Sequence, residues 1–533
     1  MQLDAICPLT TAAALARAVA IAPDVEAIVA GDGRMTYAEL DREVAALRAR
    51  LAAFGIGRGD HVGLCLGNGV RWMALFLALG ALGAVTVPIN TRFRASELAY
   101  VLRQSRVGTL FTADRFLSAD FIALLREACP AIDGGLPHPG LPDLLRVVVL
   151  GNDVPAGAMP FAALPEAAPV PPACTADDIL LIQYTSGTTS FPKGVMLPHR
   201  NMLANGFFSG ARIGFRVGDR FHSARPFFHV AGSSLSVLAA IQHAITLVTM
   251  DRFEAAKALR IMEAERCTHF SGNDTMALML LNEPERARRE LQLRGGWAAA
   301  SPAILRRIVD ELGARECVAG YGLSEASPNV AQSAWWEPEA VRVSARMLPQ
   351  PGVKLRIRGE AGDLPPGETG EILVHGWNVM QGYWDNPDET RAALDANGWL
   401  STGDLGRLDA DGRLEFLGRL KDIVRVGGEN VSPAEVEDVL HRHPAIRQAA
   451  VVGVPDPRLM EAVAAFVIPN AGQACDPVAI MTWCRSEMAA FKVPRYVWVV
   501  DGFEAIGITA SSKVQKKPLV ARARALLGLE AMP

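Results

Sequence analysis

The spacing of apolar residues in the first part of the chain predicts alternating helices and strands. Residues 36–54 carry apolar side chains three and four positions apart, and Thr36 followed by Glu39 has the form of a helix-capping box. After a glycine-rich turn, residues 61–66 form an apolar run of strand length. The alternation continues to about residue 350. Since such alternation is typical of helices layered on a mostly parallel sheet, it predicts a doubly wound α/β fold.

The pattern changes in the second part of the chain. Beyond residue 350, short apolar runs are separated by Gly, Pro and Asp, which predicts a small β-rich subdomain at about 350–420. From residue 421 onward, strand and helix patterns mix, which predicts a small α+β unit that we expect to be mobile. The expected domains are therefore 1–420 and 421–533. Strands are predicted at 370–374, 413–417, 449–454 and 464–468, and helices at 433–440 and 478–488.

One uncharged stretch, residues 73–89, raises the question of a membrane span. It contains Gly80, Gly83 and Pro88, and it falls short of the roughly 20 apolar residues that a transmembrane helix needs. A buried helix that passes through a turn into a strand explains it better, so we expect no transmembrane segment.

Composition narrows the class of protein. Of the 533 residues, 50% are hydrophobic and 21% charged, with a net charge of -4, so large cores are expected and nucleic acid is not favoured as a partner. The eight cysteines are scattered without a Cys-x-x-Cys pair. Asp4 lies early and no basic start precedes an apolar run, so no export signal is recognised and a cytoplasmic location is expected.

Residues 184–194 read Tyr-Thr-Ser-Gly-Thr-Thr-Ser-Phe-Pro-Lys-Gly and follow an apolar, strand-like run at 178–183. Hydroxyls, backbone N–H groups made accessible by glycine, and the charge of Lys193 together suit phosphate binding. The spacing is not that of the common phosphate loop. A flexible Ser/Thr/Gly linker is the alternative, but the strand before and the Pro-Lys after the hydroxyls favour phosphate binding.

Further segments of candidate chemistry follow in order: Pro-Phe-Phe-His-Val-Ala-Gly at 226–232, Gly-Tyr-Gly-Leu-Ser-Glu at 320–325, Ser-Thr-Gly-Asp at 401–404 and Ile-Thr-Ala-Ser-Ser-Lys-Val-Gln-Lys at 508–516. Tyr321 offers a ring for a base, Glu325 an oxygen ligand for Mg²⁺, and Asp404 an acceptor for both hydroxyls of a ribose. Each of the four segments also has an ordinary structural explanation. The histidine at 229 could be packed in the core, the segments 320–325 and 401–404 could be plain glycine-containing turns, and 508–516 could be part of a solvated basic tail.

In this order the motifs resemble those of the adenylate-forming superfamily, which includes acyl-CoA synthetases, peptide-synthetase adenylation domains and firefly-type luciferases. The resemblance runs from Thr36 to Lys513 and favours the acyl-CoA synthetase branch. It implies an ATP-dependent acid–CoA ligase that uses Mg²⁺. A carboxylic acid first reacts with ATP to give an acyl-adenylate and pyrophosphate, and the adenylate then reacts with CoA to give the thioester and AMP.

The resemblance also implies roles for individual residues. Lys513 and Glu325 would be catalytic, Glu325 also as the metal ligand, and Lys421 would be the hinge. Gly427 and Gly428 would line the CoA tunnel. The ATP-binding residues would be Thr185, Ser186, Gly187, Thr188, Thr189, Lys193, Tyr321, Gly322, Ser324, Asp404 and Arg419, and the substrate pocket would include His229, Val230, Ser271, Asn273, Gly296 and Ala298.

The chain departs from the family pattern at three positions. Ser324 stands where Thr is more common, which keeps the hydroxyl. Ser512 replaces the usual Gly before the catalytic lysine, and Trp297 is bulky where the family commonly has small residues.

Several alternatives stay open at this stage. The enzyme could load a carrier protein in place of CoA, act as a luciferase-like oxygenase, or be a catalytically dead nucleotide sensor. The sequence does not identify the acid. Asn273 and Asp274 either face a polar or aromatic substrate or, as we prefer, cap the following helix. A homodimer is one candidate oligomeric state.

Overall fold

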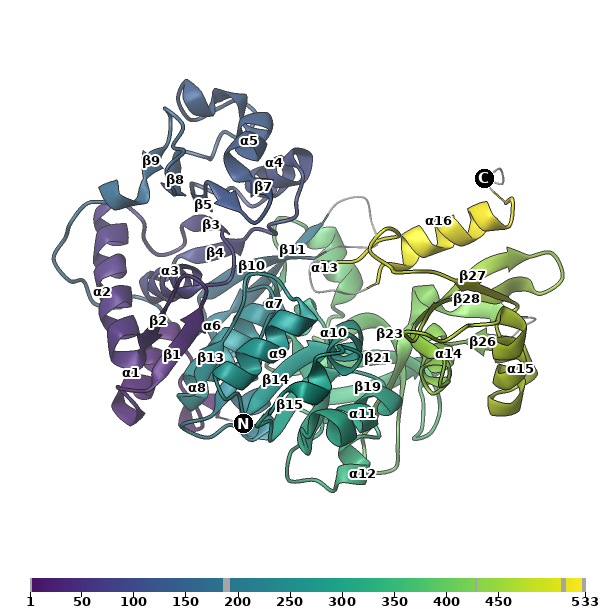
Figure 1. The fold of residues 1–533 in the computed structure, drawn as a ribbon. Coiled ribbons are helices and arrows are strands. Elements are labelled where there is room, and N and C mark those ends of the chain that lie inside the picture. Colours follow the sequence, from purple (N-terminus) through teal and green to yellow (C-terminus); the bar gives the residue numbers. More distant parts are fainter. Residues whose placement is uncertain (1, 186–191, 427–428, 510–513, 530–533) are drawn as a thin grey trace.

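The computed structural model describes residues 2–185, 192–426, 429–509 and 514–529, and shows a large layered body with a smaller C-terminal part beside it (Figure 1). The predicted fold class is confirmed. Ser186, Gly187, Thr188, Thr189, Gly427, Gly428 and Lys513 lie outside the described residues. The helices are α1 Thr11–Ile21, α2 Tyr37–Ala53, α3 Val70–Leu82, α4 Ala95–Gln104, α5 Phe121–Ala128, α6 His199–Ile213, α7 Val230–Gly232, α8 Ala239–His243, α9 Ala255–Ala264, α10 Asp274–Leu281, α11 Pro302–Leu312, α12 Glu339–Arg342, α13 Pro387–Ala393, α14 Pro433–His441, α15 Pro477–Glu487 and α16 Lys516–Leu526.

One long sheet runs through the large body and changes character along its width. From β1 to β16 the neighbours pair in parallel, apart from the edge hairpin β1–β2, and from β16 onward they pair antiparallel. The change falls at the Gly320–Glu325 motif. In order, its strands are β2 Gly33–Thr36, β1 Glu26–Ala30, β13 Thr246–Val248, β12 Arg220–Ser223, β14 His269–Asn273, β15 Gly295–Ala299, β16 Glu316–Gly322, β17 Asn329–Gln332, β18 Arg346–Pro349, β24 Leu414–Arg419, β23 Leu400–Leu408, β21 Gly370–His375, β19 Lys354–Gly359 and β20 Gly362–Asp363.

A second sheet carries the predicted phosphate-binding segment. Its strand β10 pairs in parallel with β4 and antiparallel with β11, and β10 ends at Thr185 while β11 begins at Lys193. The strands in order are β22 Gly382–Tyr383, β11 Lys193–Pro198, β10 Ile179–Thr185, β4 Val85–Pro88, β3 His61–Cys65, β5 Thr109–Ala113, β8 Arg146–Leu150 and β9 Met159–Pro160, and a separate small hairpin joins β6 Arg115–Phe116 to β7 Ala119–Asp120.

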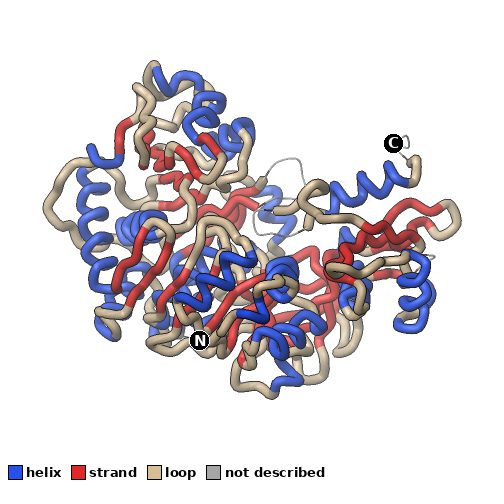
Figure 2. Tube along the Cα trace, in the orientation of Figure 1, coloured by secondary structure: helices blue, strands red, loops and turns tan. Residues whose placement is uncertain are grey.

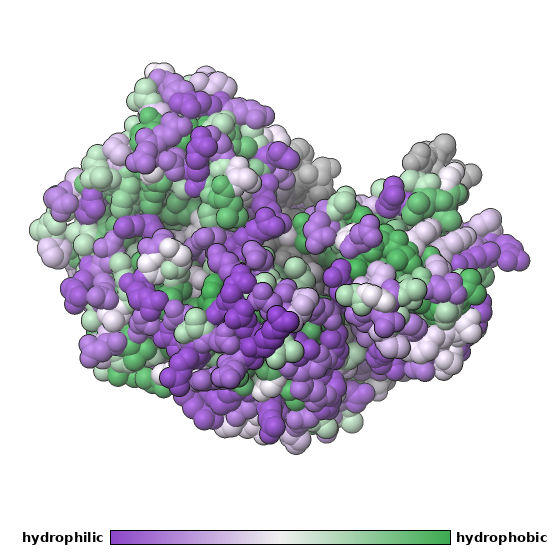
Figure 3. Space-filling model, in the orientation of Figure 1, coloured by the Kyte–Doolittle hydropathy of each residue, from purple (hydrophilic) through white to green (hydrophobic). Residues whose placement is uncertain are grey.

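The C-terminal part has its own sheet, with helices on its faces (Figure 2). One face packs Val436 and Leu440 of α14 against it, and the other packs Leu519 of α16 near Phe466. Figure 3 shows a notch between this part and the large body. The division at residue 420 stays a prediction. The strands are β26 Glu429–Val431, β25 Val424–Val426, β28 Met460–Pro469, β27 Ile446–Asp456 and β29 Tyr496–Val499.

Local sequence signals are confirmed in detail. Thr36 and Glu39 form both hydrogen bonds of the capping box at the start of α2. The uncharged stretch 73–89 is the buried helix α3 followed by the strand β4, as expected. Within the described part of the chain, none of the helices has the length and apolar character that crossing a bilayer requires.

Buried histidines predict that the protein loses stability on mild acidification. His199, His222 and His269 are almost fully buried, and desolvation lowers the pKa of each to about 4. They stay neutral in the folded state, whereas the unfolded chain protonates its histidines near pH 6.5. The contribution of the neutral histidines to the free energy of unfolding is therefore complete above pH 6.5, and it is lost as the pH falls toward 4.

We expect each of these histidines to lower the free energy of unfolding by about 2 kcal/mol between pH 7.5 and pH 5. Urea unfolding of the wild type and of His222→Gln at the two pH values measures this contribution. The variant should show a smaller pH dependence than the wild type, and an identical dependence would contradict the assignment to His222.

Candidate active site

Tyr321, Asp404 and Arg419 come together although they are far apart in the sequence. Tyr321 is near the end of β16, and Asp404 and Arg419 are paired across β23 and β24. The Tyr321 hydroxyl donates to Asp404 Oδ2 at 2.8 Å, and Arg419 Nε lies 3.7 Å from Asp404 Oδ1. Burial, followed by the charge of Asp404, raises the pKa of Tyr321 well above its usual value. The pairing of β23 with β24 thus places an anion and a cation beside a neutral phenol.

The ring of Tyr321 has an aromatic neighbour that sequence reasoning missed. The Tyr321 ring stacks on Phe416 with centroids 5.1 Å apart and an interplanar angle of 26°. Tyr321 is only 6% exposed. Phe416 comes from β24, two residues before the Gly-Arg pair at 418–419. Its position in a strand with alternating polarity was the available signal. The stack fixes the orientation of the Tyr321 ring.

Glu325 is held by two hydrogen bonds from the same short segment. The Tyr383 hydroxyl donates to its Oε1 at 3.0 Å, and the Met380 N–H donates to its backbone oxygen at 2.9 Å. Burial and the neighbouring carboxylate raise the pKa of Tyr383, so it remains a donor. The preceding turn needs glycine, because a Cβ at Gly322 would lie 2.0 Å from the Pro328 carbonyl oxygen.

The donor set around Glu325 fits Mg²⁺ bound together with a nucleotide. Within the described residues, no group of three His, Cys, Asp or Glu side chains converges in a metal-binding arrangement. Mg²⁺ commonly takes one or two carboxylates and completes its octahedron with water and substrate phosphates. The half-buried carboxylate of Glu325 has the chemistry of one such ligand.

Lys193 reaches the same tyrosine from the second sheet. Its ammonium forms an ion pair with Glu389 and lies 5.0 Å from the centroid of the Tyr383 ring. Tyr383 belongs to β22, which pairs with β11 just after Lys193. The structure thereby brings Lys193, Tyr383 and Glu325 to one place, next to the end of β10 at Thr185. Sequence reasoning missed Tyr383 and Glu389, because neither belongs to a motif with Lys193.

The predicted substrate-pocket residues lie on or near two parallel strands. Ser271 on β14 is level with Trp297 on β15, and a Cβ at Gly296 would lie 2.6 Å from the Phe270 oxygen. Val230 is buried, whereas His229 is exposed. The His229 Nδ1 accepts a hydrogen bond from the Ala231 N–H at 3.2 Å. The packed-core explanation of His229 is therefore wrong.

Asn273 is the N-cap of α10, as we preferred on sequence grounds. Its Oδ1 accepts a hydrogen bond from the Met276 N–H at 2.9 Å. Asp274 accepts one from the Ser301 N–H at 3.0 Å. These contacts account for the polar pair without a substrate.

The ring of Trp297, which the sequence could not place, lies under a buried arginine. The Arg225 guanidinium carbon is 4.0 Å from the centroid of the Trp297 ring, and the indole also lies against Gly320, where a Cβ would be 2.4 Å from Nε1. Gly320 is the first residue of the Tyr321 motif. Arg225 was missed, and the available signal was a charged residue directly before the aromatic run at 226–232.

Lys421 lies in a 3₁₀ turn, Leu420–Asp422, directly between β24 and β25. Partial desolvation, followed by the charge of Arg419, lowers its pKa. Its predicted role as a hinge is not tested by a single structure.

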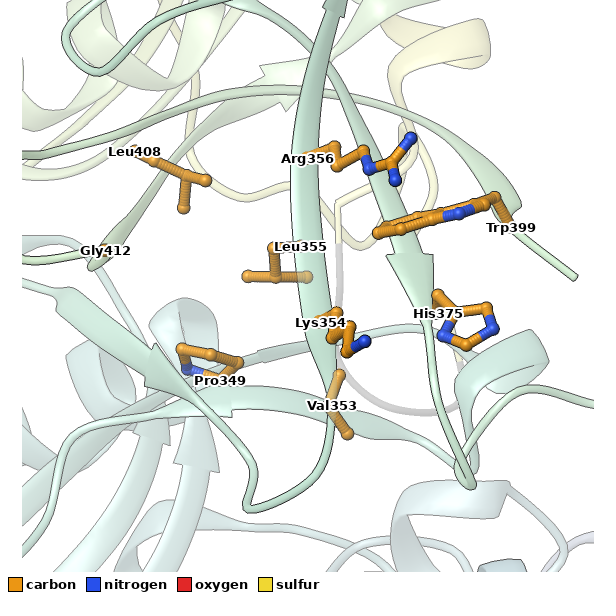
Figure 4. Close-up of a pocket in the computed structure, with 9 residues that line it drawn as sticks. All are labelled: Pro349, Val353, Lys354, Leu355, Arg356, His375, Trp399, Leu408 and Gly412. Atoms are coloured by element: carbon orange, nitrogen blue, oxygen red, sulfur yellow. The ribbon is translucent and has the colours of Figure 1, made fainter. Parts of the chain in front are cut away.

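A separate pocket opens in the β-rich region and contains none of the predicted site residues. Arg356 lies over the ring of Trp399 on one side of it (Figure 4), with 4.0 Å between the guanidinium carbon and the ring centroid. Its lining comes from Pro349, Val353, Lys354, Leu355, Arg356, His375, Trp399, Leu408 and Gly412.

Comparison with known proteins identifies the family of this chain. The model of a family described as AMP-binding enzyme matches residues 15–384, and that of the AMP-binding enzyme C-terminal domain matches residues 435–513. The chain is 36% identical over 525 residues to 3-[(3aS,4S,7aS)-7a-methyl-1,5-dioxo-octahydro-1H-inden-4-yl]propanoyl:CoA ligase of Mycobacterium tuberculosis, covering 96% of this chain and 98% of the relative. It is 34% identical over 535 residues to the mitochondrial medium-chain acyl-CoA ligase ACSF2 of Danio rerio, and this match covers 95% of this chain and 87% of the relative.

Among solved structures, the crystal structure of the anthranilate CoA ligase AuaEII in complex with anthranoyl-AMP superposes with a TM-score of 0.88 at 26% identity, covering 99% of this chain and 100% of that one. The chain belongs to the AMP-binding enzyme family, in its acyl-CoA synthetase branch. It is an ATP-dependent acid–CoA ligase, with ATP and CoA as co-substrates and Mg²⁺ as the metal of the family. The expected function is thus confirmed at the level of reaction class.

Proposed function

We propose that adenylation takes place between the end of β10 and the turn that follows β16, with the nucleotide between two groups of side chains. Tyr321, Asp404 and Arg419 form the first group, which suits adenine and ribose. Lys193 and Glu325, joined by Tyr383, form the second, which suits the phosphates. The convergence of Lys193 and Glu325 on Tyr383 is the observation that supports this assignment most directly.

Each residue has a physical task in the first half-reaction. The substrate carboxylate attacks the α-phosphorus of ATP, a new C–O–P linkage forms, and the bond to pyrophosphate breaks. The carboxylate and the triphosphate repel each other, so catalysis consists mainly of positioning and charge neutralisation. Lys193 and the hydroxyls of 185–189 hold the β- and γ-phosphates, and Asp404 accepts the ribose hydroxyls. Ser324 donates to the α-phosphate.

Glu325 would hold Mg²⁺, which neutralises phosphate charge when bound. Lys513 supplies a second positive charge near the α-phosphate and the carboxylate. In the second half-reaction the C-terminal part turns about Lys421, Lys513 leaves, and Gly427 and Gly428 line the path by which the CoA thiol reaches the adenylate. The thiol sulfur forms the thioester bond to the acyl carbon as the acyl–oxygen bond to AMP breaks.

The proposal is tested by pyrophosphate release with a panel of short, medium-length, long and aromatic acids, in the presence of ATP, followed by addition of CoA or of a carrier protein. We expect acid-dependent pyrophosphate release, and AMP formation with CoA as acceptor. Pyrophosphate release without formation of acyl-CoA, together with acylation of the added carrier protein, would favour a carrier protein as the acceptor. ATP that is never consumed with any acid would contradict the ligase assignment. A cytoplasmic location and a homodimeric state stay predictions.

A further inference from the structure

Arg225 is a buried cation without a carboxylate partner. Its side chain is only 7% exposed, and its Nη2 donates to the Gly272 carbonyl oxygen at 3.3 Å. Among the described residues, no carboxylate lies within ion-pair distance of it, whereas Arg220 on the adjoining strand has both Glu26 and Glu265. Desolvation lowers the pKa of Arg225 to about 9, so the guanidinium is still charged at neutral pH.

Three buried polar atoms, one of them in this guanidinium, have no hydrogen-bond partner among the described residues. They are Arg225 Nη1, Trp297 Nε1 and Ser271 Oγ. Ser271 and Trp297 are level with each other on the adjacent strands β14 and β15, so their side chains share one face of the sheet. Arg225 lies over the Trp297 ring. We call these three residues the Arg225 cluster.

The contacts within the cluster do not compensate for burying the charge. A cation over an indole face is attracted to the ring, and more strongly when it is desolvated. That attraction is smaller than the cost of burying an unpaired ion, and unmade hydrogen bonds add to the cost. A buried guanidinium that has no carboxylate partner and keeps an unused N–H donor fits an oxygen-bearing anion, and arginine binds carboxylates especially well.

The Arg225 cluster is also next to the proposed acid site. Trp297 lies between Gly296 and Ala298, and its ring contacts Gly320, beside Tyr321. Arg225 precedes His229 by four positions in the loop after β12. Asn68 fixes that loop, since its Nδ2 donates to the Arg225 carbonyl oxygen at 2.8 Å and its Oδ1 accepts from the Phe227 N–H at 2.7 Å. The backbone at Arg225 is therefore fixed, and the guanidinium is oriented by the Gly272 carbonyl oxygen and the Trp297 ring.

We infer that the Arg225 cluster binds a second carboxylate of the substrate, at the end remote from the reacting one, so that the enzyme prefers dicarboxylic acids. This inference rests on the proposed function of the neighbouring site. The second carboxylate would accept hydrogen bonds from Arg225 Nη1, Trp297 Nε1 and the Ser271 hydroxyl. Because these donors lie at fixed positions, only diacids whose length spans the distance to the α-phosphate should benefit.

The test compares straight-chain dicarboxylic acids with monocarboxylic acids of equal carbon number, for the wild type and for Arg225→Met. For the best diacid, we expect the wild-type kcat/KM to exceed that of the matched monoacid about tenfold or more, since one charge-assisted pair is at stake. Arg225→Met should remove this preference, mainly through a higher KM for the diacid, and leave monoacid activity nearly unchanged. Arg200→Met, a change at a partly exposed arginine that is paired with Asp177, is the matched control.

A wild-type enzyme that adenylates monoacids as well as, or better than, diacids of every length would overturn the inference and leave the ligase function intact. A parallel loss for both acid series in Arg225→Met would also overturn it, because it would show a purely structural role. Trp297→Phe keeps an aromatic face but lacks Nε1, so it should lower diacid activity selectively even if Arg225→Met fails to fold. Equal effects of Trp297→Phe on both series would contradict the inference. An enzyme that adenylates neither series would contradict the ligase function itself.

Discussion

Replacing Lys513 by alanine is expected to slow adenylate formation about 100-fold or more, equivalent to at least about 2.7 kcal/mol of transition-state stabilisation. The ammonium is proposed to act where negative charge builds up on the α-phosphate and the carboxylate. In the proposed mechanism, the second half-reaction takes place after Lys513 has left the site. Thioester formation from supplied acyl-adenylate and CoA should therefore proceed at nearly the wild-type rate.

A nearby lysine, Lys517, provides a control for the loss of positive charge at Lys513. Ile508 and Val514 form an antiparallel bridge, and the Gln515 N–H donates to the Gly507 oxygen at 3.1 Å, so the chain is fixed on both sides of residues 510–513. Lys516 forms an ion pair with Glu437 and donates to the Val451 oxygen at 2.7 Å, which ties it to its own part of the fold. Lys517 is exposed, and Lys517→Ala should leave both half-reactions unchanged.

Single-turnover measurements of each half-reaction separate the outcomes for Lys513→Ala. Adenylation is followed by pyrophosphate release, and thioester formation by AMP release from added acyl-adenylate. If the variant slowed both half-reactions equally, the proposal that Lys513 serves only the first would be wrong.

Features that depend on neighbours in the sequence could be predicted from the sequence. The capping box of Thr36 and Glu39 and the N-cap at Asn273 each require only a side chain and a backbone N–H a few residues away. The buried stretch 73–89 was recognisable by its length and its glycines. The change near residue 350 from alternating helices and strands to short strands was also recognisable, because Gly, Pro and Asp mark the turns between short strands.

Features that depend on long-range pairing were not predictable in this way. The β-rich region was expected as a small subdomain of the large domain, and nothing in its sequence pattern indicated that its strands continue the long sheet through the pairing of β18 with β24. The contacts of Tyr383 with Glu325 and of Arg225 with Trp297 likewise join segments with no common period. No hydrophobic pattern encodes such contacts, since each involves one polar or aromatic residue in an otherwise ordinary stretch. The motif residues themselves were recognisable, whereas the groups that orient them were not.

The second large effect is expected for Glu325→Gln, which should lower kcat/KM for ATP about 100-fold at limiting Mg²⁺. The substitution keeps the shape of the side chain and an oxygen that can accept the hydrogen bond from Tyr383, so the local fold should persist. It removes the negative charge, and a neutral amide oxygen binds a hard divalent cation more weakly than a carboxylate does. Raising the Mg²⁺ concentration should restore part of the activity, and the half-saturating Mg²⁺ concentration should rise.

Two variants separate the charge of Glu325 from its orientation. Tyr383→Phe keeps the carboxylate but removes the hydrogen bond at 3.0 Å, so it should raise the Mg²⁺ requirement less than Glu325→Gln does. Glu389→Gln weakens the ion pair with Lys193 and should change the response to ATP more than the response to Mg²⁺, because Lys193 is proposed to bind phosphate. An unchanged Mg²⁺ dependence in Glu325→Gln would show that Glu325 is not the metal ligand. The activity loss would then have to come from the packing of the turn at 322–326, which is so tight that a Cβ at Gly322 would lie 2.0 Å from the Pro328 carbonyl oxygen.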